Sequence, residues 1–310
     1  NLEMVREMGA PWIVEYFPWA YCEPREGRYD WRHADLVIEH ALAQGLTIIA
    51  RIDYVPEWAR PPETTARYLP EESFPQYARF VAAFAERYRG RVNHIIIWNE
   101  PNLHGYMWKG SDQAFFSFYS KVSQALKKRF PHLKIGGAGL ADCNYESEQP
   151  TYLDKFLGHC RHSGAVLDFF SVHRYSAELS GVLSLPDLLK DKLSENGFPD
   201  SEIIIDEWHY FPGDWSRLAD PDYAREMMEG EQGVSGLDAA AFLAAVLSGW
   251  QNTPLHMACY YSSGTLFWGL FDRYHKPYKT YYAFKAFGSL LDFKAVRVAA
   301  QSSADTQVLA

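Results

Sequence analysis

Short apolar runs alternate with amphipathic stretches along almost the whole chain. Most of these runs are near-continuous Ile, Val, Leu and Phe, which is typical of parallel strands that pack on one face and are covered on the other. On this pattern the sequence predicts seven strands, near residues 12–17, 46–53, 92–99, 133–138, 166–173, 203–208 and 256–261.

The stretches between these runs have the 3.6-residue period of helices. In two of them, at 74–88 and 115–130, large apolar residues fall on one face, and Ser73 and Ser111 are their expected N-caps. The polar segment 211–236 is predicted to be a loop with room for a short helix. Further helices are predicted at about 1–8, 31–44, 149–163, 183–195, 236–252 and 277–290.

Near-regular alternation of strands and helices favours a (β/α)8 TIM barrel over an open doubly wound sheet, and no GxGxxG turn follows any strand. Eight helices but only seven strands are predicted, so strand 1 is expected ahead of the first helix, upstream of the sequence given. The alternative is a closing or accessory role for the β-like tail at 295–299. We expect the barrel to cover 1–292, and 293–310 to be a tail or the start of a β accessory segment.

Charge and hydropathy narrow the set of partners. The net charge is −9 and no basic stripe occurs, which argues against nucleic acid as a ligand. No apolar stretch is long enough to cross a bilayer, so no membrane partner is predicted. No signal peptide is visible, but the chain begins at Asn1 rather than Met, which leaves the compartment open. The oligomeric state also stays open.

Residue types that mark particular ligands are unevenly represented. Aromatic residues make up 16% of the chain, and their faces can stack on sugar rings or simply fill a large core. The four cysteines are far apart, with no CxxC pair and no HxH or HExxH spacing elsewhere. We therefore predict no metal and no cofactor, and buried thiols that behave as small hydrophobes.

Two of the predicted strands end in glutamates, Glu100 after the run 94–99 and Glu207 after the run 202–206. Barrel enzymes carry their active sites at the carboxyl ends of the strands. Retaining glycoside cleavage needs two carboxyl groups about 5–5.5 Å apart, one to attack the anomeric carbon and one to protonate the leaving oxygen. The competing interpretation is that both glutamates form ordinary ion pairs.

The segments around these glutamates have a family resemblance. Residues 98–102 (Trp-Asn-Glu-Pro-Asn) resemble the strand-4 signature of clan A glycoside hydrolases, which implies that Glu100 is the general acid/base. Residues 205–208 (Ile-Asp-Glu-Trp) resemble the strand-7 segment of that clan, which implies that Glu207 is the nucleophile. Both carboxylates would then serve a retaining double displacement on a poly- or oligosaccharide.

Other segments agree with the clan in order along the chain, and together they resemble family 39 and its relatives, the β-xylosidases, α-L-iduronidases and exopolysaccharide hydrolases. The chain departs from this pattern at Glu15, where the clan usually has an Arg on strand 2, and at His209, after Trp208. Both departures leave the sugar open. The agreeing segments are 27–31, 55–58, 171–175 and 276–287.

The resemblance also implies residues that bind the substrate. Asn99 would bond the sugar 2-hydroxyl, provided that the strand ends or bulges there so that Asn99 and Glu100 can both face the site. Tyr175 would hydrogen-bond the nucleophile, and His173 would line the pocket unless it is a satisfied core histidine. Tryptophans at or beyond strand ends are candidate sugar platforms or plain packing, namely Trp58, Trp108, Trp208 and Trp268.

Three more charged residues stand at strand ends. By strand alternation Asp206 is expected to point away from Glu207, towards the helices, in a structural role. Arg51 would either bind a substrate carboxylate or, as we favour, pair with a glutamate of the barrel, and Asp53 also ends a strand.

Two other classes of barrel protein compete with a glycosidase. A non-catalytic carbohydrate-binding barrel would keep the cleft, but loss of turnover usually removes one of the two carboxylates. A metal-dependent hydrolase or an aldolase would need a metal cluster or a Schiff-base Lys at a strand end, and no predicted strand ends in Lys.

Overall fold

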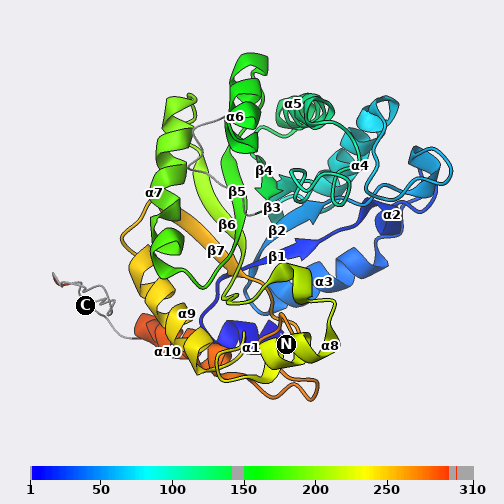
Figure 1. The fold of residues 1–310 in the computed structure, drawn as a ribbon. Coiled ribbons are helices and arrows are strands. Elements are labelled where there is room, and N and C mark those ends of the chain that lie inside the picture. Colours follow the sequence, from blue (N-terminus) through cyan, green and yellow to red (C-terminus); the bar gives the residue numbers. More distant parts are fainter. Residues whose placement is uncertain (1, 142–149, 293–297, 299–310) are drawn as a thin grey trace. The chain divides into compact units, whose positions relative to one another are not determined.

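The computed structural model describes residues 2–141, 150–292 and 298. Its strands form one sheet whose spatial order follows the chain from first to last, and neighbouring strands among the first five pair in parallel (Figure 1). All seven predicted strands are confirmed to within a few residues. They are β1 (Trp12–Tyr16), β2 (Thr47–Ile52), β3 (Val92–Ile97), β4 (Lys134–Leu140), β5 (Phe169–Tyr175), β6 (Glu202–His209) and β7 (Leu255–Tyr260).

The eight predicted helices are present, and α8 is the short helix for which the polar segment 211–236 has room. One further short helix, α2 after β1, was not expected. Ser111 caps its helix as expected, because its side chain accepts a hydrogen bond from the backbone of Ala114. Ser73 also occupies the N-cap position of its helix, but its hydroxyl makes no capping bond and donates instead to the carbonyl of Ala59. The helices are α1 (Leu2–Glu7), α2 (Trp19–Cys22), α3 (Arg32–Ala43), α4 (Phe74–Arg87), α5 (Asp112–Arg129), α6 (Tyr152–Ser163), α7 (Leu179–Glu195), α8 (Pro221–Glu229), α9 (Leu237–Trp250) and α10 (Lys279–Gly288).

The chain divides into two compact units. We call Trp12–His173 with Lys190–Asp206 the N-terminal unit, and Asn1–Pro11 with Arg174–Leu189 and the residues from Glu207 onward the C-terminal unit. Two strands pass from one unit into the other. The chain crosses between positions 173 and 174 within β5 and between 206 and 207 within β6.

The N-terminal unit has a core of aliphatic strand residues on one side and aromatic helix residues on the other. The last residues of β3, Ile95–Ile97, and Trp98 directly after the strand are completely buried, and α4 and α5 pack against each other beside it. The ring of Trp98 lies edge-on to Trp108, 5.0 Å away between centroids, and its indole N–H donates to the Met107 carbonyl. Burial of each such ring contributes about 1.5–3 kcal/mol, which anchors the segment that follows β3.

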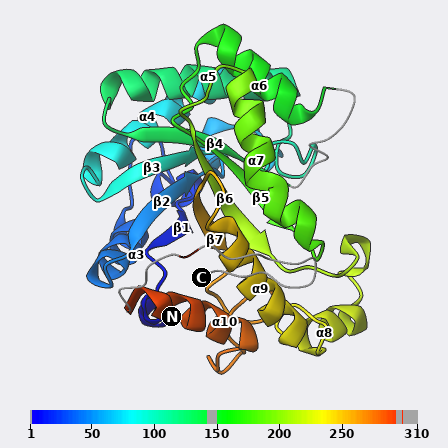
Figure 2. The same ribbon diagram turned by 90° about the vertical axis from the view of Figure 1, so that its left-hand side faces the viewer.

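The C-terminal unit is organised around α9 and α10, which lie side by side in both ribbon views (Figures 1 and 2). Trp208 of β6 packs against Trp250 of α9 and Phe284 of α10. These contacts fix the end of β6 within its own unit.

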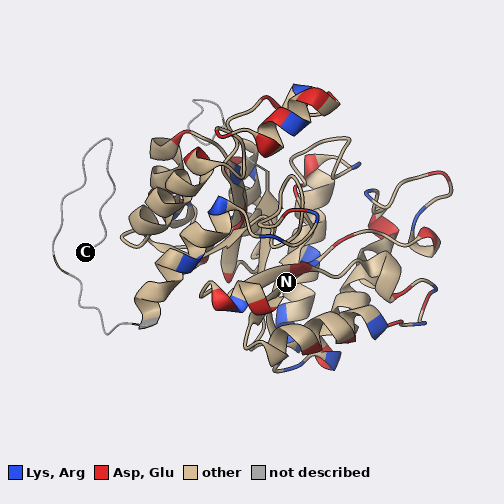
Figure 3. Ribbon diagram, turned by 90° about the horizontal axis from the view of Figure 1, so that it is seen from below, with Lys and Arg blue, Asp and Glu red and all other residues tan. Residues whose placement is uncertain are grey.

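Acidic and basic residues are interspersed along the described ribbon (Figure 3). Among the helices that the structure describes, none is both long and apolar enough to cross a membrane. The β-like tail at 295–299 lies, apart from Val298, outside the described residues, and the strand expected ahead of the first helix stays a prediction.

Candidate active site

The segment Trp98–Glu100 leaves the sheet with an irregular backbone. Strand β3 ends at Ile97, and both Trp98 (φ 73°) and Glu100 (φ 46°) adopt the left-handed conformation, which is uncommon for residues with a side chain. The regular strand therefore ends before Asn99. This is the condition under which Asn99 and Glu100 could both face one site. The Glu100 amide donates to the Gly139 carbonyl at 2.9 Å, which ties this turn to β4.

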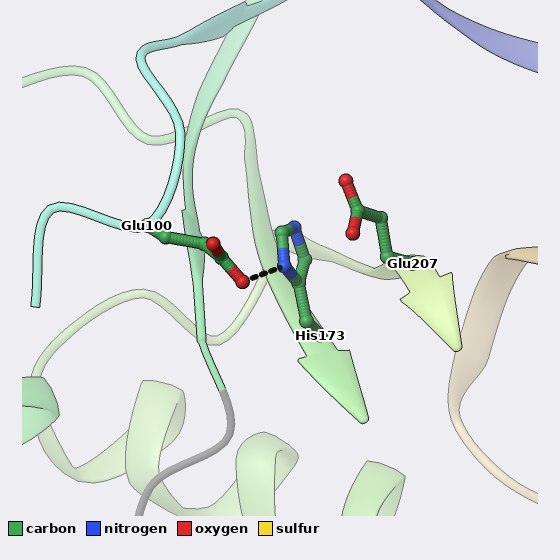
Figure 4. Close-up of side chains that lie close together, drawn as sticks. All are labelled: Glu100, His173 and Glu207. Atoms are coloured by element: carbon green, nitrogen blue, oxygen red, sulfur yellow. Dashed lines mark hydrogen bonds and ion pairs between the residues drawn. The ribbon is translucent and has the colours of Figure 1, made fainter. Parts of the chain in front are cut away.

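His173 of β5 holds the side chain of Glu100. Its Nδ1 lies 2.8 Å from Glu100 Oε1 (Figure 4), and the imidazole is completely buried, whereas 17% of the glutamate side chain is exposed. The buried imidazole fixes the orientation of the Glu100 carboxyl group, while the rest of that group stays partly accessible to solvent.

A buried ion pair lies behind this histidine. Arg51 Nη2 is 2.6 Å from Asp206 Oδ2, both side chains are fully buried, and Arg51 Nη1 donates to the Tyr16 hydroxyl at 2.7 Å. His173 Nε2 lies 3.3 Å from Arg51 Nη2 and 3.7 Å from Asp206 Oδ2. Burial alone would raise the pKa of Asp206, but Arg51 and His173 outweigh it, so this pKa lies below its usual value.

Two expectations need correction here. Asp206 was expected to point towards the helices, but it contacts Arg51 and lies near His173, which belong to two other strands. The buried carboxylate of Asp206 is compensated there by the guanidinium of Arg51, which a position among apolar helix residues would not supply. Arg51 was expected to pair with a glutamate, and it pairs with Asp206.

Gly139 of β4 lets the chain pass close to these groups. A Cβ at this position would lie 3.3 Å from both Asp206 Oδ2 and His173 Nε2, and 3.6 Å from Asn99 Oδ1. Its φ of 56° is in the left-handed region, which glycine adopts without strain.

In the C-terminal unit, Tyr175 holds Glu207. The tyrosine hydroxyl donates to Glu207 Oε2 at 2.7 Å, which is the hydrogen bond expected from the sequence, and only 7% of Glu207 is exposed. The Tyr175 ring lies edge-on to Trp268 and to Trp215, each 5.4 Å away between centroids. A hydrogen bond donated to a carboxylate favours its ionised form.

His209 at the end of β6 is a buried structural histidine. Its Nδ1 lies 2.7 Å from the Tyr210 carbonyl and its Nε2 lies 2.7 Å from the Tyr260 hydroxyl. A carbonyl can only accept, so Nδ1 carries the proton and Nε2 accepts from Tyr260. Burial lowers the pKa of His209 to about 4, so the ring is neutral near pH 7.

The candidate tryptophans lie in different surroundings. Trp208 (1% exposed) and Trp108 (0%) are packing residues of their units. The half-buried Trp58 donates from its indole N–H to the Glu23 carbonyl and lies edge-on to the buried Trp19. Trp268 differs from the other three, because its ring lies edge-on to Tyr175, the residue that bonds Glu207.

Several residues were not singled out as functional from the sequence. Trp215 lies in the polar segment after β6, and Gly139 lies in β4, a strand that carries no candidate catalytic residue. Glu15 and Asp53 were noted and have local partners: Glu15 accepts from the Tyr16 amide, and Asp53 pairs with Arg67. An isolated tryptophan in a polar loop was the available signal for Trp215.

The chain alternates strands and helices, and it carries one hydrogen-bonded glutamate after β3 and another in β6. This is the organisation of a glycoside hydrolase barrel. The chain belongs to the glycosyl hydrolases family 39, whose sequence model matches residues 23–283. This match confirms the resemblance seen in the motifs.

Individual relatives are distant and longer. A beta-xylosidase of Caldicellulosiruptor saccharolyticus is 24% identical over 158 residues, which is 47% of this chain and 31% of the relative. An alpha-L-iduronidase of Mus musculus is 27% identical over 151 residues, 43% of this chain and 24% of the relative. The chain thus matches less than a third of the length of these curated proteins.

Solved structures show the fold. A glucosidase from Croceicoccus marinus superposes with a TM-score of 0.74 at 18% identity, over 94% of this chain and 62% of that one. A monomeric beta-xylosidase from Caulobacter crescentus gives 0.72 at 18% identity, over 93% and 63%. The predicted TIM-barrel class is confirmed.

Proposed function

We propose that this chain is the catalytic barrel of a retaining glycoside hydrolase, with Glu207 as nucleophile and Glu100 as general acid/base. Family membership supports the reaction class. The observation that carries the residue assignment is that one strand, β5, holds both carboxylates through side chains two positions apart.

His173 bonds Glu100 and Tyr175 bonds Glu207. In a strand, residues i and i+2 point to the same face and their Cα atoms are about 6.6 Å apart. We therefore propose that the two carboxyl groups flank one glycosidic bond, for which a retaining enzyme needs about 5–5.5 Å between them. Chain continuity adds to this, because Glu207 follows directly on Asp206, which contacts Arg51 in the N-terminal unit.

The reaction would run in two steps. In the first, the Glu207 carboxylate attacks the anomeric carbon, the bond to the leaving oxygen breaks, and Glu100 gives its proton to that oxygen. In the second, the Glu100 carboxylate takes a proton from water as the water oxygen attacks the same carbon and releases Glu207. The hydrogen bond that Tyr175 donates to Glu207 Oε2 favours the carboxylate form that the first step requires.

Asn99 is proposed to bind the sugar 2-hydroxyl. It is 1% exposed, and its Oδ1 has no hydrogen-bond partner among the described residues. A buried acceptor without a donor is costly, and a substrate hydroxyl would satisfy it. His173, next to Glu100, and Trp268, next to Tyr175, are proposed to contact the substrate. Trp58 and Trp208 stay predicted sugar contacts; Trp208 is 1% exposed and Trp58 donates from its indole N–H to the Glu23 carbonyl.

The substrate proposed for first trial is a β-xyloside, because curated relatives of the chain include beta-xylosidases. Purified wild type, Glu100→Ala and Glu207→Ala would be incubated with a panel of aryl glycosides and with the matching 2-fluoro glycosyl fluorides, which trap the glycosyl-enzyme. Glu202→Ala, at the opposite end of β6, is the matched control.

We expect the trapped sugar on the peptide that contains Glu207. Azide should rescue Glu100→Ala on activated leaving groups, because this anion attacks the anomeric carbon of the glycosyl-enzyme and releases Glu207 without the base that water needs. A wild type inactive on every glycoside would favour a sugar-binding barrel, and a label elsewhere would overturn the assignment. Activity unchanged by a chelator would support the prediction that the reaction needs no metal.

A further inference from the structure

The loop after β6 carries an exposed tryptophan. Trp215 opens a short 3-10 turn and exposes 53% of its surface, the largest fraction of any tryptophan in residues 2–141 and 150–292. An indole normally buries most of its surface, so one left open in a polar loop calls for an explanation.

This ring is held in place by its neighbours. Trp215 stacks on Trp268 with centroids 5.6 Å apart and planes 26° apart, and it lies 4.4 Å from Phe211. The turn itself is fixed, because Asp214 Oδ1 accepts from both the amide and the hydroxyl of Ser216. The exposed indole surface is therefore presented in a fixed orientation, at little conformational cost on binding.

The location of Trp215 connects it to the proposed nucleophile within one unit. The ring of Tyr175 contacts both Trp215 and Trp268, while its hydroxyl bonds Glu207. Trp215 is thus one aromatic ring away from the carboxylate that would attack the sugar.

We propose that Trp215, supported by Trp268, is a stacking platform for a second sugar ring, next to the one that Glu207 attacks. The ligand class is a pyranose oligosaccharide, or a glycan with a sugar adjoining the attacked ring, rather than a monosaccharide on a small aglycone. This inference rests on the proposed function for its place in the reaction. The C–H faces of pyranoses offer the flat, weakly apolar surface that an indole face can cover.

The test compares substrates with one and two rings. Xylosyl fluoride places a ring only at the attacked position, xylobiose adds a ring on the leaving side, and xylobiosyl fluoride adds one on the other side. For Trp215→Ala we expect kcat/KM to fall roughly 3- to 10-fold on one of the two-ring substrates and to stay unchanged on xylosyl fluoride. Trp215→Phe should retain part of the effect.

The control is Tyr282→Ala, which removes another exposed aromatic ring of the same unit, on α10. The platform would be overturned if Trp215→Ala had the wild-type kcat/KM on all three substrates. It would also be overturned if kcat/KM fell by the same factor on all three. A circular dichroism spectrum and melting temperature like those of wild type would exclude misfolding as the cause.

Binding alone separates this inference from the proposed function. Xylotriose would be titrated calorimetrically into Glu100→Gln, with and without Trp215→Ala. A roughly 3- to 10-fold weaker Kd on loss of the indole supports the platform even if the fluoro-sugars fail to label. Unchanged or undetectable binding in both proteins, with Glu207 labelled normally, would sink the platform and leave the proposed function standing.

Discussion

Removing the cation from the buried Arg51–Asp206 pair should be strongly destabilising. In Arg51→Met, Asp206 keeps its charge near pH 7 but loses the contact at 2.6 Å, in a place where both side chains are fully buried. Breaking such a pair typically costs about 3–5 kcal/mol, because an uncompensated charge stays behind. That is a large share of the roughly 5–15 kcal/mol that stabilises most proteins.

The pH dependence gives this prediction its sign. In wild type the folded-state pKa of Asp206 is lowered, so its contribution to stability is present above the unfolded pKa of about 3.9 and is lost as pH falls through the folded value. In Arg51→Met this pKa is higher than in wild type, because burial, which raises it, is then opposed by His173 alone. The loss of stability relative to wild type should therefore shrink as the pH is lowered, because Asp206 can then be protonated.

The assay is urea unfolding followed by tryptophan fluorescence at pH 7 and at pH 5. Asp30→Asn is the control, since its pair with Arg32 is exposed and should contribute little. Arg51→Met with Asp206→Leu should recover stability, because an apolar pair can replace a buried ion pair. The reasoning would be refuted if Arg51→Met unfolded at the wild-type urea concentration, or if its deficit grew at the lower pH.

Three further predictions concern single residues. Tyr175→Phe should lower kcat on aryl glycosides roughly 10-fold or more, because a hydrogen bond to a charged group contributes about 1.5–3 kcal/mol, and wild-type kcat would contradict its role at Glu207. Gly139→Ala should lower the free energy of unfolding by about 1–3 kcal/mol in urea titrations, because the φ of this residue is left-handed and the new Cβ would crowd Asp206. An unchanged urea midpoint would count against that packing. Burial lowers the folded-state pKa of His209 to about 4, so the free energy of unfolding of wild type should fall as the pH drops from about 6.5 to about 4. His209→Gln should reduce this pH dependence of stability. Identical pH profiles for the two proteins would rule out His209 as the source of the dependence.

The sequence was sufficient for the order of elements and for the two glutamates. Near-continuous apolar runs predict buried strands directly from the local sequence. Glu100 and Glu207 are easily recognised because each is a charged residue that follows such a run. The hydrogen bond from Tyr175 to Glu207 followed from the resemblance, and the structure contains it.

The network behind these residues could not be predicted. Strand alternation alone directs Asp206 towards the helices, whereas the partner that it contacts, Arg51, is 155 positions away in the chain. Ser73 has the residue type of an N-cap, but its hydroxyl is used by a carbonyl outside the helix. Such choices depend on which groups become buried together, and that is decided by the tertiary fold.

The proposed double displacement is tested most directly by the anomeric configuration of the first sugar released. Proton NMR of a β-xyloside digest, recorded before the product equilibrates in water, distinguishes the two anomers. We predict that the β-anomer appears first, because two successive inversions at the anomeric carbon restore its configuration. Initial release of the α-anomer would contradict the covalent step and, with it, the role proposed for Glu207.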